Sequence, residues 1–528
     1  MRLFDEHYKR KQFLLDGMWN FASGEGFEIK LNKNPMKVTV PSCINQRLGF
    51  MDFNSVCGFR KDFYAHGAIT IKFYAVTEYA RVYLDGKFLG DHYGGFSAFE
   101  FDTVVNEGMH TLLVTVDPRS SEDTIPQWEV DWFHYCGIIR SVEVSEFANV
   151  AIKSLRVDYT LDDELKNADA AVKVRLKNFY DADIEKQVKI DIDGKVIFDE
   201  KVSVRGELEI SAPVHIDSVR LWDVRKPELY TVRVQTDDDD LTDKIGFRKI
   251  ETRGRKIYLN NKPIKFLGVN RHECHPDWGF AMPAALDARD MDILNDLGVN
   301  TVRGSHYPNT QLFVDMCDAN GIMFWSEIPM WGFKAEALAR PLVIERGLAM
   351  HREMIEQYRN HPSIVIWGLH NEVATDTCEG YAVTKEFSEL VRSLDSTRLV
   401  TYATNRAQKD ICLKFADIIC INRYIGWYDG KLPEWQEFVD STKKYFESVG
   451  VGDKPIVMSE FGVGAMYGTR GFDDLKWSEN YQCEFYRKTL DLFLNDGDMS
   501  GVYLWQFCDI RSNADWSLLR ARSFNNKG

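Results

Sequence analysis

The second half of the chain alternates between short apolar runs and longer amphipathic stretches, and this pattern limits the fold more than any other feature. Apolar runs of this length suit buried strands, whereas the stretches between them repeat apolar residues at helical spacing. We expect strands at 263–269, 300–303, 322–325, 364–367, 399–402, 417–421, 455–458 and 502–507, and helices at 286–297, 309–320, 342–359, 381–394, 435–448 and 477–494. Eight parallel β/α units close on themselves, so the pattern predicts a (β/α)8 TIM barrel.

The predicted barrel lacks a helix after its eighth strand. Only a polar segment rich in Arg and Asn follows residue 507, whereas a closed barrel needs a helix there to cover the seam between strands eight and one. We therefore expect the sequence to be a shortened form of a longer chain, rather than a barrel that naturally lacks this helix.

Two β domains are expected before the barrel. Short alternating strands bounded by turn signals such as Asp85-Gly86 fill residues 1–148 and predict a jelly-roll β-sandwich. Residues 149–246 alternate in a more polar pattern, with a hairpin signal at Asp193-Gly194, and predict an immunoglobulin-like β-sandwich. The barrel then occupies 247–528. We interpret the acidic run from Asp237 to Asp240 as a solvated turn rather than a calcium site.

Charge and cysteine content exclude several classes of protein. A net charge of −15 argues against a nucleic-acid or anionic-membrane partner, because both need a basic surface. No apolar run approaches the roughly 18 residues of a membrane span, and charges interrupt the N-terminus where a signal peptide would be apolar. The ten cysteines form no Cys-x-x-Cys pair, which suits reduced thiols. We therefore expect a cytoplasmic protein.

Two carboxylates stand out where the predicted barrel strands end. Glu372 follows strand four and Glu460 follows strand seven. Chemistry in such barrels takes place at the C-terminal ends of the strands, and strands four and seven face each other across the mouth. Cleavage of a glycosidic bond needs one protonated carboxyl for the leaving oxygen and one ionised carboxylate for the anomeric carbon. The pair therefore predicts a glycosidase. The alternative, an ion pair at a strand end, explains one Glu more easily than both.

The cluster His272-Glu273-Cys274-His275 is the strongest candidate for a metal site. It is not the His-Glu-x-x-His pattern of a helical zinc site, and the end of a strand would direct alternate side chains to opposite faces. We expect neither a metal nor another cofactor, and we place His272 near the substrate instead.

Two motifs resemble the catalytic motifs of glycoside hydrolase family 2. The segment 367–372 (WGLHNE) resembles the acid/base motif of that family, and 458–462 (MSEFG) resembles its nucleophile motif. Similar segments occur in both predicted β domains, at 15–21 (LDGMWNF), 132–140 (WFHYCGIIR) and 221–248. The resemblance covers essentially the whole chain. It implies a retaining glycosidase with Glu372 as acid/base and Glu460 as nucleophile.

A further motif near residue 528 resembles one that marks β-glucuronidases within this family. Asn525-Asn526-Lys527 matches their Asn-x-Lys element. A glucuronide differs from a glucoside by a carboxylate at C6, which needs a local cation and directed donors in an acidic protein. The resemblance implies that Lys527 and Asn525 contact this carboxylate. A neighbouring arginine is also implied, and either Arg520 or Arg522 can fill that role.

The resemblance also implies a set of sugar-binding residues around the two carboxylates. Their implied roles are binding of the sugar hydroxyls, orientation of the nucleophile by a tyrosine hydroxyl, and a stacking floor under the ring. These residues are Asp131, His272, His306, Asn371, Tyr424, Tyr428 and Trp505.

Together these features predict an exo-acting β-glucuronidase that acts on small glucuronides or on glucuronate-containing saccharides. A β-galacturonidase or β-galactosidase of the same family is the alternative. A non-catalytic sugar-binding protein fits less well, because both carboxylates are present. The segment 329–346 is short compared with family members that carry a long loop there, which predicts an open mouth. The resemblance further implies a homo-oligomer, either a tetramer or a dimer.

Overall fold

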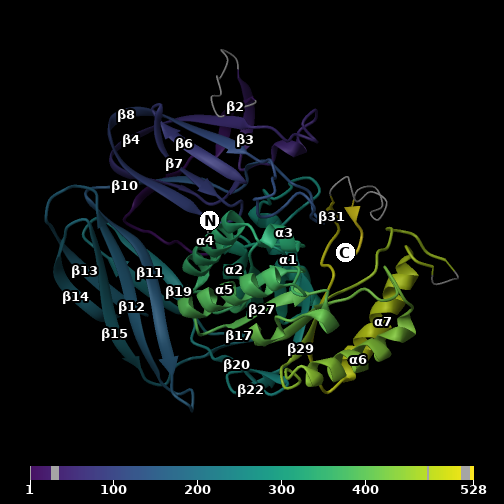
Figure 1. Ribbon diagram of the computed structural model, residues 1–528. Coiled ribbons are helices and arrows are strands. Elements are labelled where there is room, and N and C mark those ends of the chain that lie inside the picture. Colours follow the sequence, from purple (N-terminus) through teal and green to yellow (C-terminus); the bar gives the residue numbers. More distant parts are fainter. Residues whose placement is uncertain (1, 25, 27–34, 472–474, 513–523) are drawn as a thin grey trace.

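An antiparallel sheet of eight strands dominates the N-terminal region (Figure 1). The structure is a computed structural model that describes residues 2–24, 26, 35–471, 475–512 and 524–528. Alternate residues of β6 are buried, as expected for a strand with one face on a core. The strands are β1 (Lys11–Leu14), β2 (Gly17–Ser23), β3 (Met36–Val40), β4 (Cys57–Phe73), β6 (Tyr79–Leu84), β7 (Lys87–Tyr93), β8 (Phe99–Asp117) and β10 (Val142–Phe147), and a small separate sheet pairs β5 (Val76–Thr77) with β9 (Gly137–Ile138).

Two further antiparallel sheets follow and share one core. Strand β12 buries every second residue, and its inward side chains pack with those of β13 and β18 from the other sheet. This arrangement is a β-sandwich. One sheet contains β11 (Val150–Leu161), β12 (Ala168–Asn178) and β15 (Glu207–Ile216), and the other contains β14 (Lys195–Val204), β13 (Ile184–Ile192), β18 (Tyr230–Gln235) and β19 (Asp240–Ile245). Two small sheets lead to the barrel. One pairs β16 (Trp222–Asp223) with β17 (Lys226–Pro227), and the other has the three strands β20 (Ile250–Arg253), β21 (Lys256–Leu259) and β22 (Lys262–Ile264).

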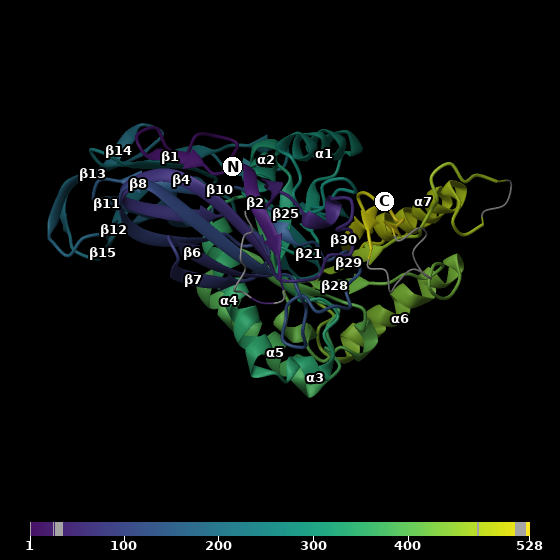
Figure 2. The ribbon, with the colours of Figure 1, turned by 90° about the horizontal axis from the view of Figure 1, so that it is seen from above.

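The remaining strands form a closed parallel barrel, which confirms the predicted TIM barrel. Helices α4, α5 and α6 lie on the outside of the molecule (Figure 2), and α2 contacts β25, α5 contacts β26 and β27, and α7 contacts β30. The strands are β23 (Phe266–Asn270), β24 (Thr301–Gly304), β25 (Met323–Glu327), β26 (Ile364–Asn371), β27 (Leu399–Thr404), β28 (Ile419–Asn422), β29 (Ile456–Phe461) and β30 (Met499–Leu504). The helices are α1 (Ala284–Leu297), α2 (Gln311–Asn320), α3 (Ala335–Leu338), α4 (Pro341–Tyr358), α5 (Cys378–Leu394), α6 (Trp435–Ser448) and α7 (Glu479–Asn495).

The barrel differs from the sequence prediction at several strand ends. Strand β30 begins and ends three residues earlier than the expected 502–507. Glu460 lies inside β29 rather than after it, because the strand continues to Phe461. The connection between β27 and β28, for which no helix was predicted, contains two 3-10 helices, Ala407–Lys409 and Leu413–Phe415, and no α-helix within residues 405–418, all of which the structure describes.

Local sequence signals explain where several helices begin and end. The hydroxyls of Thr310, Thr377 and Ser478 accept backbone N–H groups at the starts of α2, α5 and α7. Gly298 ends α1 in the left-handed region, with a φ of 76°, which a residue without a Cβ adopts most easily.

The segment after β30 carries no α-helix among residues 505–512 and 524–528, the part that the structure describes. Strand β31 (Ile510–Arg511) pairs antiparallel with β32 (Phe524–Asn525). Leu267 in β23 is 38% exposed, an unusually high value for a barrel strand. Within the described residues, no helix is long and apolar enough to cross a lipid bilayer.

The interpretation of the run Asp237 to Asp240 as a solvated turn is wrong for its second half. Asp239 is 1% exposed and Asp240 is fully buried. Arg10 pairs with Asp239 at 2.8 Å, and Arg233 pairs with Asp240 at 3.0 Å. Asp240 also accepts the backbone N–H groups of residues 8 and 9. Burial is tolerated here because cations and backbone donors from the N-terminal segment compensate both charges.

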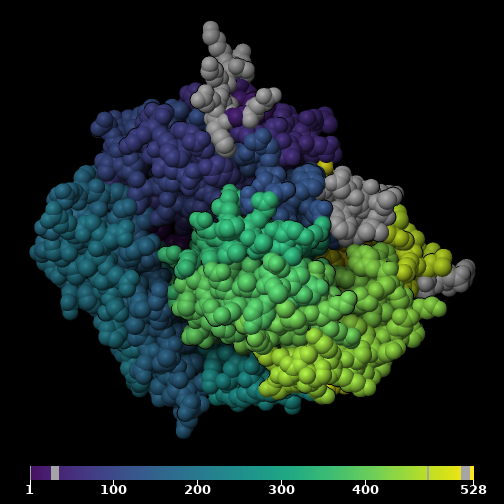
Figure 3. Space-filling model, viewed as in Figure 1, coloured from purple at the N-terminus to yellow at the C-terminus, as the bar shows by residue number. Residues whose placement is uncertain are grey.

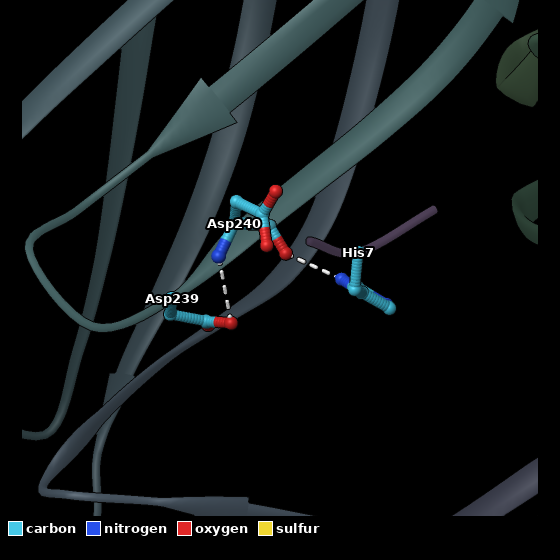
Figure 4. A group of neighbouring side chains, drawn as sticks. All are labelled: His7, Asp239 and Asp240. Atoms are coloured by element: carbon cyan, nitrogen blue, oxygen red, sulfur yellow. Dashed lines mark hydrogen bonds between the residues drawn. The ribbon is translucent and has the colours of Figure 1, made fainter. Parts of the chain in front are cut away.

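His7 lies beside Asp239 and Asp240 and could complete a cation site with them (Figure 4). The carboxylates, however, already accept hydrogen bonds from arginine side chains and backbone amides. This cluster therefore fastens the N-terminal segment to the second β region, and nothing further points to a bound ion.

Arg2 makes a second buried attachment, between the sandwich and the barrel. Its guanidinium pairs with Asp243 of β19 at 2.8 Å and with Asp315 of α2 at 2.8 Å, and the Arg2 side chain is only 5% exposed. Both ribbon views accordingly place the N-terminus beside the barrel helix α2 (Figures 1 and 2). Asp315 also lies near Asp318 and His361, but Arg2 occupies the cation position in this cluster.

The N-terminal sheet contributes to the mouth of the barrel. Its surface rests against the barrel helices in the space-filling view (Figure 3). The loop between β8 and β9 carries Trp132, whose ring lies 5.5 Å from those of His272 and His306 at the carboxyl ends of β23 and β24. The site is therefore built from two regions of the sequence.

Candidate active site

Glu372 and Glu460 lie at the same end of the barrel. Glu372 directly follows β26 and Glu460 lies near the carboxyl end of β29. Glu372 has a φ of 54°, a left-handed conformation that is uncommon for a residue with a Cβ and that often occurs at functional sites. Burial raises the pKa of both carboxyls, and the negative charge of Glu460 raises the pKa of Glu372 further.

Glu460 is surrounded by groups that favour its ionised form. Arg303 donates to Oε1 at 2.8 Å, and the Tyr424 hydroxyl donates to Oε2 at 2.7 Å. His306 Nε2 lies 3.9 Å from Oε1. Burial raises the pKa of Glu460, whereas Arg303 and Tyr424 oppose that rise. The carboxylate is thus fixed by two donors, one on each oxygen.

Glu372 has a different environment. Asn422 donates to Oε1 of its carboxyl at 2.8 Å and Asn405 donates to Oε2 at 3.0 Å, and both of these donors are neutral amides. Burial and the nearby charge of Glu460 raise the pKa of Glu372 to about 8. Burial raises the pKa of both carboxyls, but only Glu460 has a guanidinium and a tyrosine hydroxyl that oppose the rise, and this difference in environment is the kind that acid and nucleophile roles require.

Arg303 bonds to several site residues at once, and it was not among the site residues predicted from the sequence. Besides Glu460, it donates to Glu327 at 2.8 Å and to Asn371 Oδ1 at 2.7 Å, and it is fully buried. Asn422 also donates to Asn371 Oδ1, at 3.1 Å. The other side-chain atom, Asn371 Nδ2, is buried and has no hydrogen-bond partner among the described residues. The available signal was the position of Arg303 and Glu327 at the ends of two barrel strands.

Aromatic rings form one wall of the site. His306 stacks on Trp505 with ring centroids 5.2 Å apart, and His272 lies edge-on to Trp505 at 5.5 Å. Burial lowers the pKa of both His272 and His306 well below the usual histidine value, so both are neutral near pH 7. Trp132 completes this wall, and the sequence analysis did not assign it to the site.

The Asn-x-Lys segment also contributes to the site. Asn525 is fully buried and donates to Asp131 Oδ2 at 2.8 Å. Lys527 is 2% exposed and donates to the Tyr428 hydroxyl at 3.0 Å. The Lys527 ammonium also lies 5.5 Å from the ring centroid of Tyr424, whose hydroxyl contacts Glu460.

The structure thus brings together all of the predicted site residues that it describes. Lys527 lies beside the ring of Tyr424, whose hydroxyl contacts Glu460. Arg303 in turn connects Glu460 to Asn371, the residue directly before Glu372. Tyr428 is 48% exposed and lies at the edge of the group. Arg520 and Arg522 lie outside the described residues.

The metal alternative for 272–275 gains no support from its surroundings. Glu273 pairs with Arg140 at 2.6 Å and accepts the Thr310 backbone N–H, whereas His272 Nδ1 contacts the Tyr307 hydroxyl. Alternate side chains of this segment face different partners, as expected at the end of a strand.

Two family models match the sequence. The model described as glycosyl hydrolases family 2, TIM barrel domain, covers residues 250–517, and the model described as glycosyl hydrolases family 2 covers residues 150–248. The chain therefore belongs to glycosyl hydrolase family 2. It is a glycoside hydrolase.

Individual relatives in this family have three different specificities. A β-glucuronidase from Streptococcus agalactiae is 26% identical over 98% of this chain and 93% of its own length. A β-galactosidase from Thermoanaerobacterium thermosulfurigenes is 30% identical over 86% of this chain, which spans 63% of that relative. The crystal structure of a β-galacturonidase from Eisenbergiella tayi bound to galacturonate superposes with a TM-score of 0.92, at 31% identity, and covers 100% of this chain and 95% of its own.

Proposed function

We propose that this glycoside hydrolase is an exo-acting, retaining β-glucuronidase that hydrolyses β-D-glucuronides by double displacement. The observation that carries the specificity is the buried Lys527, which lies against the Tyr428 hydroxyl and beside the tyrosine that holds Glu460. In a chain with a net charge of −15, this ammonium is a local positive site next to the tyrosine that contacts the nucleophile. A carboxylate on the sugar ring can pair with it.

In the first step, a carboxylate oxygen of Glu460 attacks the anomeric carbon. The protonated carboxyl of Glu372 transfers its proton to the glycosidic oxygen as the bond to the leaving group breaks, and a glycosyl ester on Glu460 forms. The protonation states fit these roles, because Arg303 and Tyr424 favour an ionised Glu460 whereas Glu372 retains its proton at neutral pH.

In the second step, Glu372 acts as a general base. Its carboxylate takes a proton from a water molecule, and the water oxygen attacks the anomeric carbon from the side that the leaving group occupied. The ester bond breaks, Glu460 is released as a carboxylate, and the sugar keeps its β configuration. Burial and the returning charge of Glu460 then favour the protonated form of Glu372 for the next cycle.

The other site residues bind and orient the sugar in this proposal. The unpartnered Nδ2 of Asn371 is suited to donate to the sugar 2-hydroxyl. The neutral His272 and His306 bind hydroxyls as hydrogen-bonding groups rather than as charges, and Trp505 lies under the ring. Asn525, whose amide donates to Asp131, contacts the C6 carboxylate together with Lys527, and Asp131 binds sugar hydroxyls. A role for Arg520 or Arg522 at the carboxylate stays a prediction.

A β-galacturonidase is the second candidate, and the similarity to the Eisenbergiella tayi structure favours it. Galacturonides and glucuronides carry the same carboxylate and differ at C4, so Lys527 does not separate them. A β-galactosidase fits less well, because a galactoside has no carboxylate to pair with the buried ammonium.

The test compares kcat/KM for the p-nitrophenyl β-glucuronide, β-galacturonide and β-galactoside in the wild type and in Lys527→Ala. We expect the glucuronide to be preferred, and the variant to lose about 100-fold on uronides but far less on the galactoside, since truncating one partner of a buried charge pair is costly. Proton NMR should show β-glucuronate as the first product. Faster turnover of galacturonide would transfer the assignment to the second candidate, and faster turnover of galactoside would refute the role of Lys527.

A further inference from the structure

The Asn-x-Lys segment is held by backbone hydrogen bonds to two neighbouring parts of the barrel. The N–H of Gln506, just after β30, donates to the Lys527 carbonyl at 2.9 Å. The N–H of Ala465, after the nucleophile strand β29, donates to the Asn526 carbonyl at 2.8 Å. These bonds fix both peptide groups on either side of the Lys527 Cα.

Two side chains add further bonds to the same segment. One Asp509 oxygen accepts the Gly528 N–H at 2.9 Å, and the other accepts the Asn526 side-chain amide at 3.2 Å. The amide of Gln506 donates to the Asn525 carbonyl at 3.2 Å. Asp509 and Gln506 thus reach every residue of the motif through groups other than those proposed to contact the sugar.

Gly528 lets the segment pack directly against the backbone of residues 508 and 509. A Cβ at this position would lie 2.2 Å from the Asp509 nitrogen and 2.2 Å from the Cys508 carbonyl carbon, distances that no real Cβ adopts. Any larger residue must therefore push the segment away from 508–509. The absence of a side chain at 528 is needed for the observed position of Lys527.

The position of the Lys527 ammonium depends on this attachment. Its nitrogen lies between three rings, at 5.5 Å from Tyr424, 5.7 Å from Trp427 and 5.0 Å from Tyr428. Rings attract a cation only at close range and over their faces, so a shift of the backbone would take the ammonium out of this cage.

We infer that Asp509, Gln506 and Gly528 are positioning residues that set the preference for uronides, because they hold the Lys527 backbone where its ammonium meets the sugar carboxylate. This inference rests on the proposed function, in which Lys527 binds that carboxylate. None of the three is assigned a contact with the reacting atoms.

The test is a double-mutant cycle between Asp509→Ala and Lys527→Ala, with kcat/KM for p-nitrophenyl β-glucuronide as the readout. We expect Asp509→Ala alone to lower kcat/KM about 10- to 100-fold, mainly through KM, because two hydrogen bonds to the segment are lost. In the Lys527→Ala background the same change should cost no more than about twofold, since the group that it positions is already gone. Asp509→Asn retains an acceptor for the Gly528 N–H and should recover part of the loss.

Gly528→Ala should behave like Asp509→Ala in both backgrounds. Gly497→Ala is the matched control, because a Cβ at 497 has no atom within 4 Å. Thermal melts monitored by circular dichroism identify any variant that does not fold, and the Asp509→Asn cycle then replaces the Ala cycle.

Equal losses from Asp509→Ala in both backgrounds would overturn the inference and leave the proposed function intact, because Asp509 would then act on the whole pocket. Unchanged glucuronide turnover in Lys527→Ala would overturn both.

Discussion

The pKa of Glu372 predicts a specific limit to activity at high pH. If Glu372 is the proton donor, kcat/KM must fall as the free enzyme loses this proton, and the value of about 8 sets the midpoint. A single group with this pKa is about 3% protonated at pH 9.5, so kcat/KM should fall to about 3% of its plateau there, and tenfold for each further pH unit. The direction of the change follows from the role of Glu372 as proton donor. Activity needs its protonated form, which is present below the pKa and is lost above it.

The assay measures kcat/KM from pH 5 to 10 with phenyl β-glucuronide, whose leaving group needs protonation, and with 2,4-dinitrophenyl β-glucuronide, whose leaving group does not. The basic limb should be steep for the first substrate and weak for the second. In Glu372→Gln the limb should disappear, while the activated substrate still forms the ester on Glu460. A limb that persists in Glu372→Gln, or that has its midpoint near the ordinary carboxyl pKa, would refute the assignment.

Three further outcomes are expected. Tyr424→Phe removes the donor at 2.7 Å from Glu460 and should move the acidic limb of the pH profile up by about one unit, because the hydroxyl stabilises the ionised form; an unmoved limb would contradict this. Glu460→Gln should lower kcat by at least about 10⁴-fold while calorimetry still detects glucuronate, so retained turnover would place the nucleophile elsewhere. Arg2→Ala leaves Asp243 and Asp315 without their buried partner and should lower the free energy of unfolding in urea by about 3–5 kcal/mol, whereas a loss below about 1 kcal/mol would show that the attachment is dispensable.

The barrel was predictable because its strands are buried on both sides. A strand of this kind is a short apolar run, and 364–367 and 399–402 match the starts of β26 and β27 at residue level. The eighth strand was placed too late, because the apolar character continues through Trp505 and Phe507, where the chain has already left the sheet. Side-chain polarity alone does not show where backbone pairing stops.

The site was predictable where a residue had its own chemical signal and unpredictable where it acts through another. Glu372 and Glu460 were visible as carboxylates at strand ends. Arg303 was not, because its function depends on three partners that are 24 to 157 residues away in the sequence. The burial of Asp240 was missed for the same reason, since its compensating donors come from residues 8–10 and from Arg233.

The loop that carries Asp131 and Trp132 has an evolutionary consequence. Under the proposed function, a catalytic barrel that takes sugar-binding residues from a neighbouring region does not evolve as an independent unit. Recombination that replaced the N-terminal β region with the equivalent region of a distant family member would exchange part of the proposed site together with the scaffold. New specificities in such enzymes should therefore arise by paired change in both regions, and bare barrels excised for engineering should lose selectivity before they lose their fold.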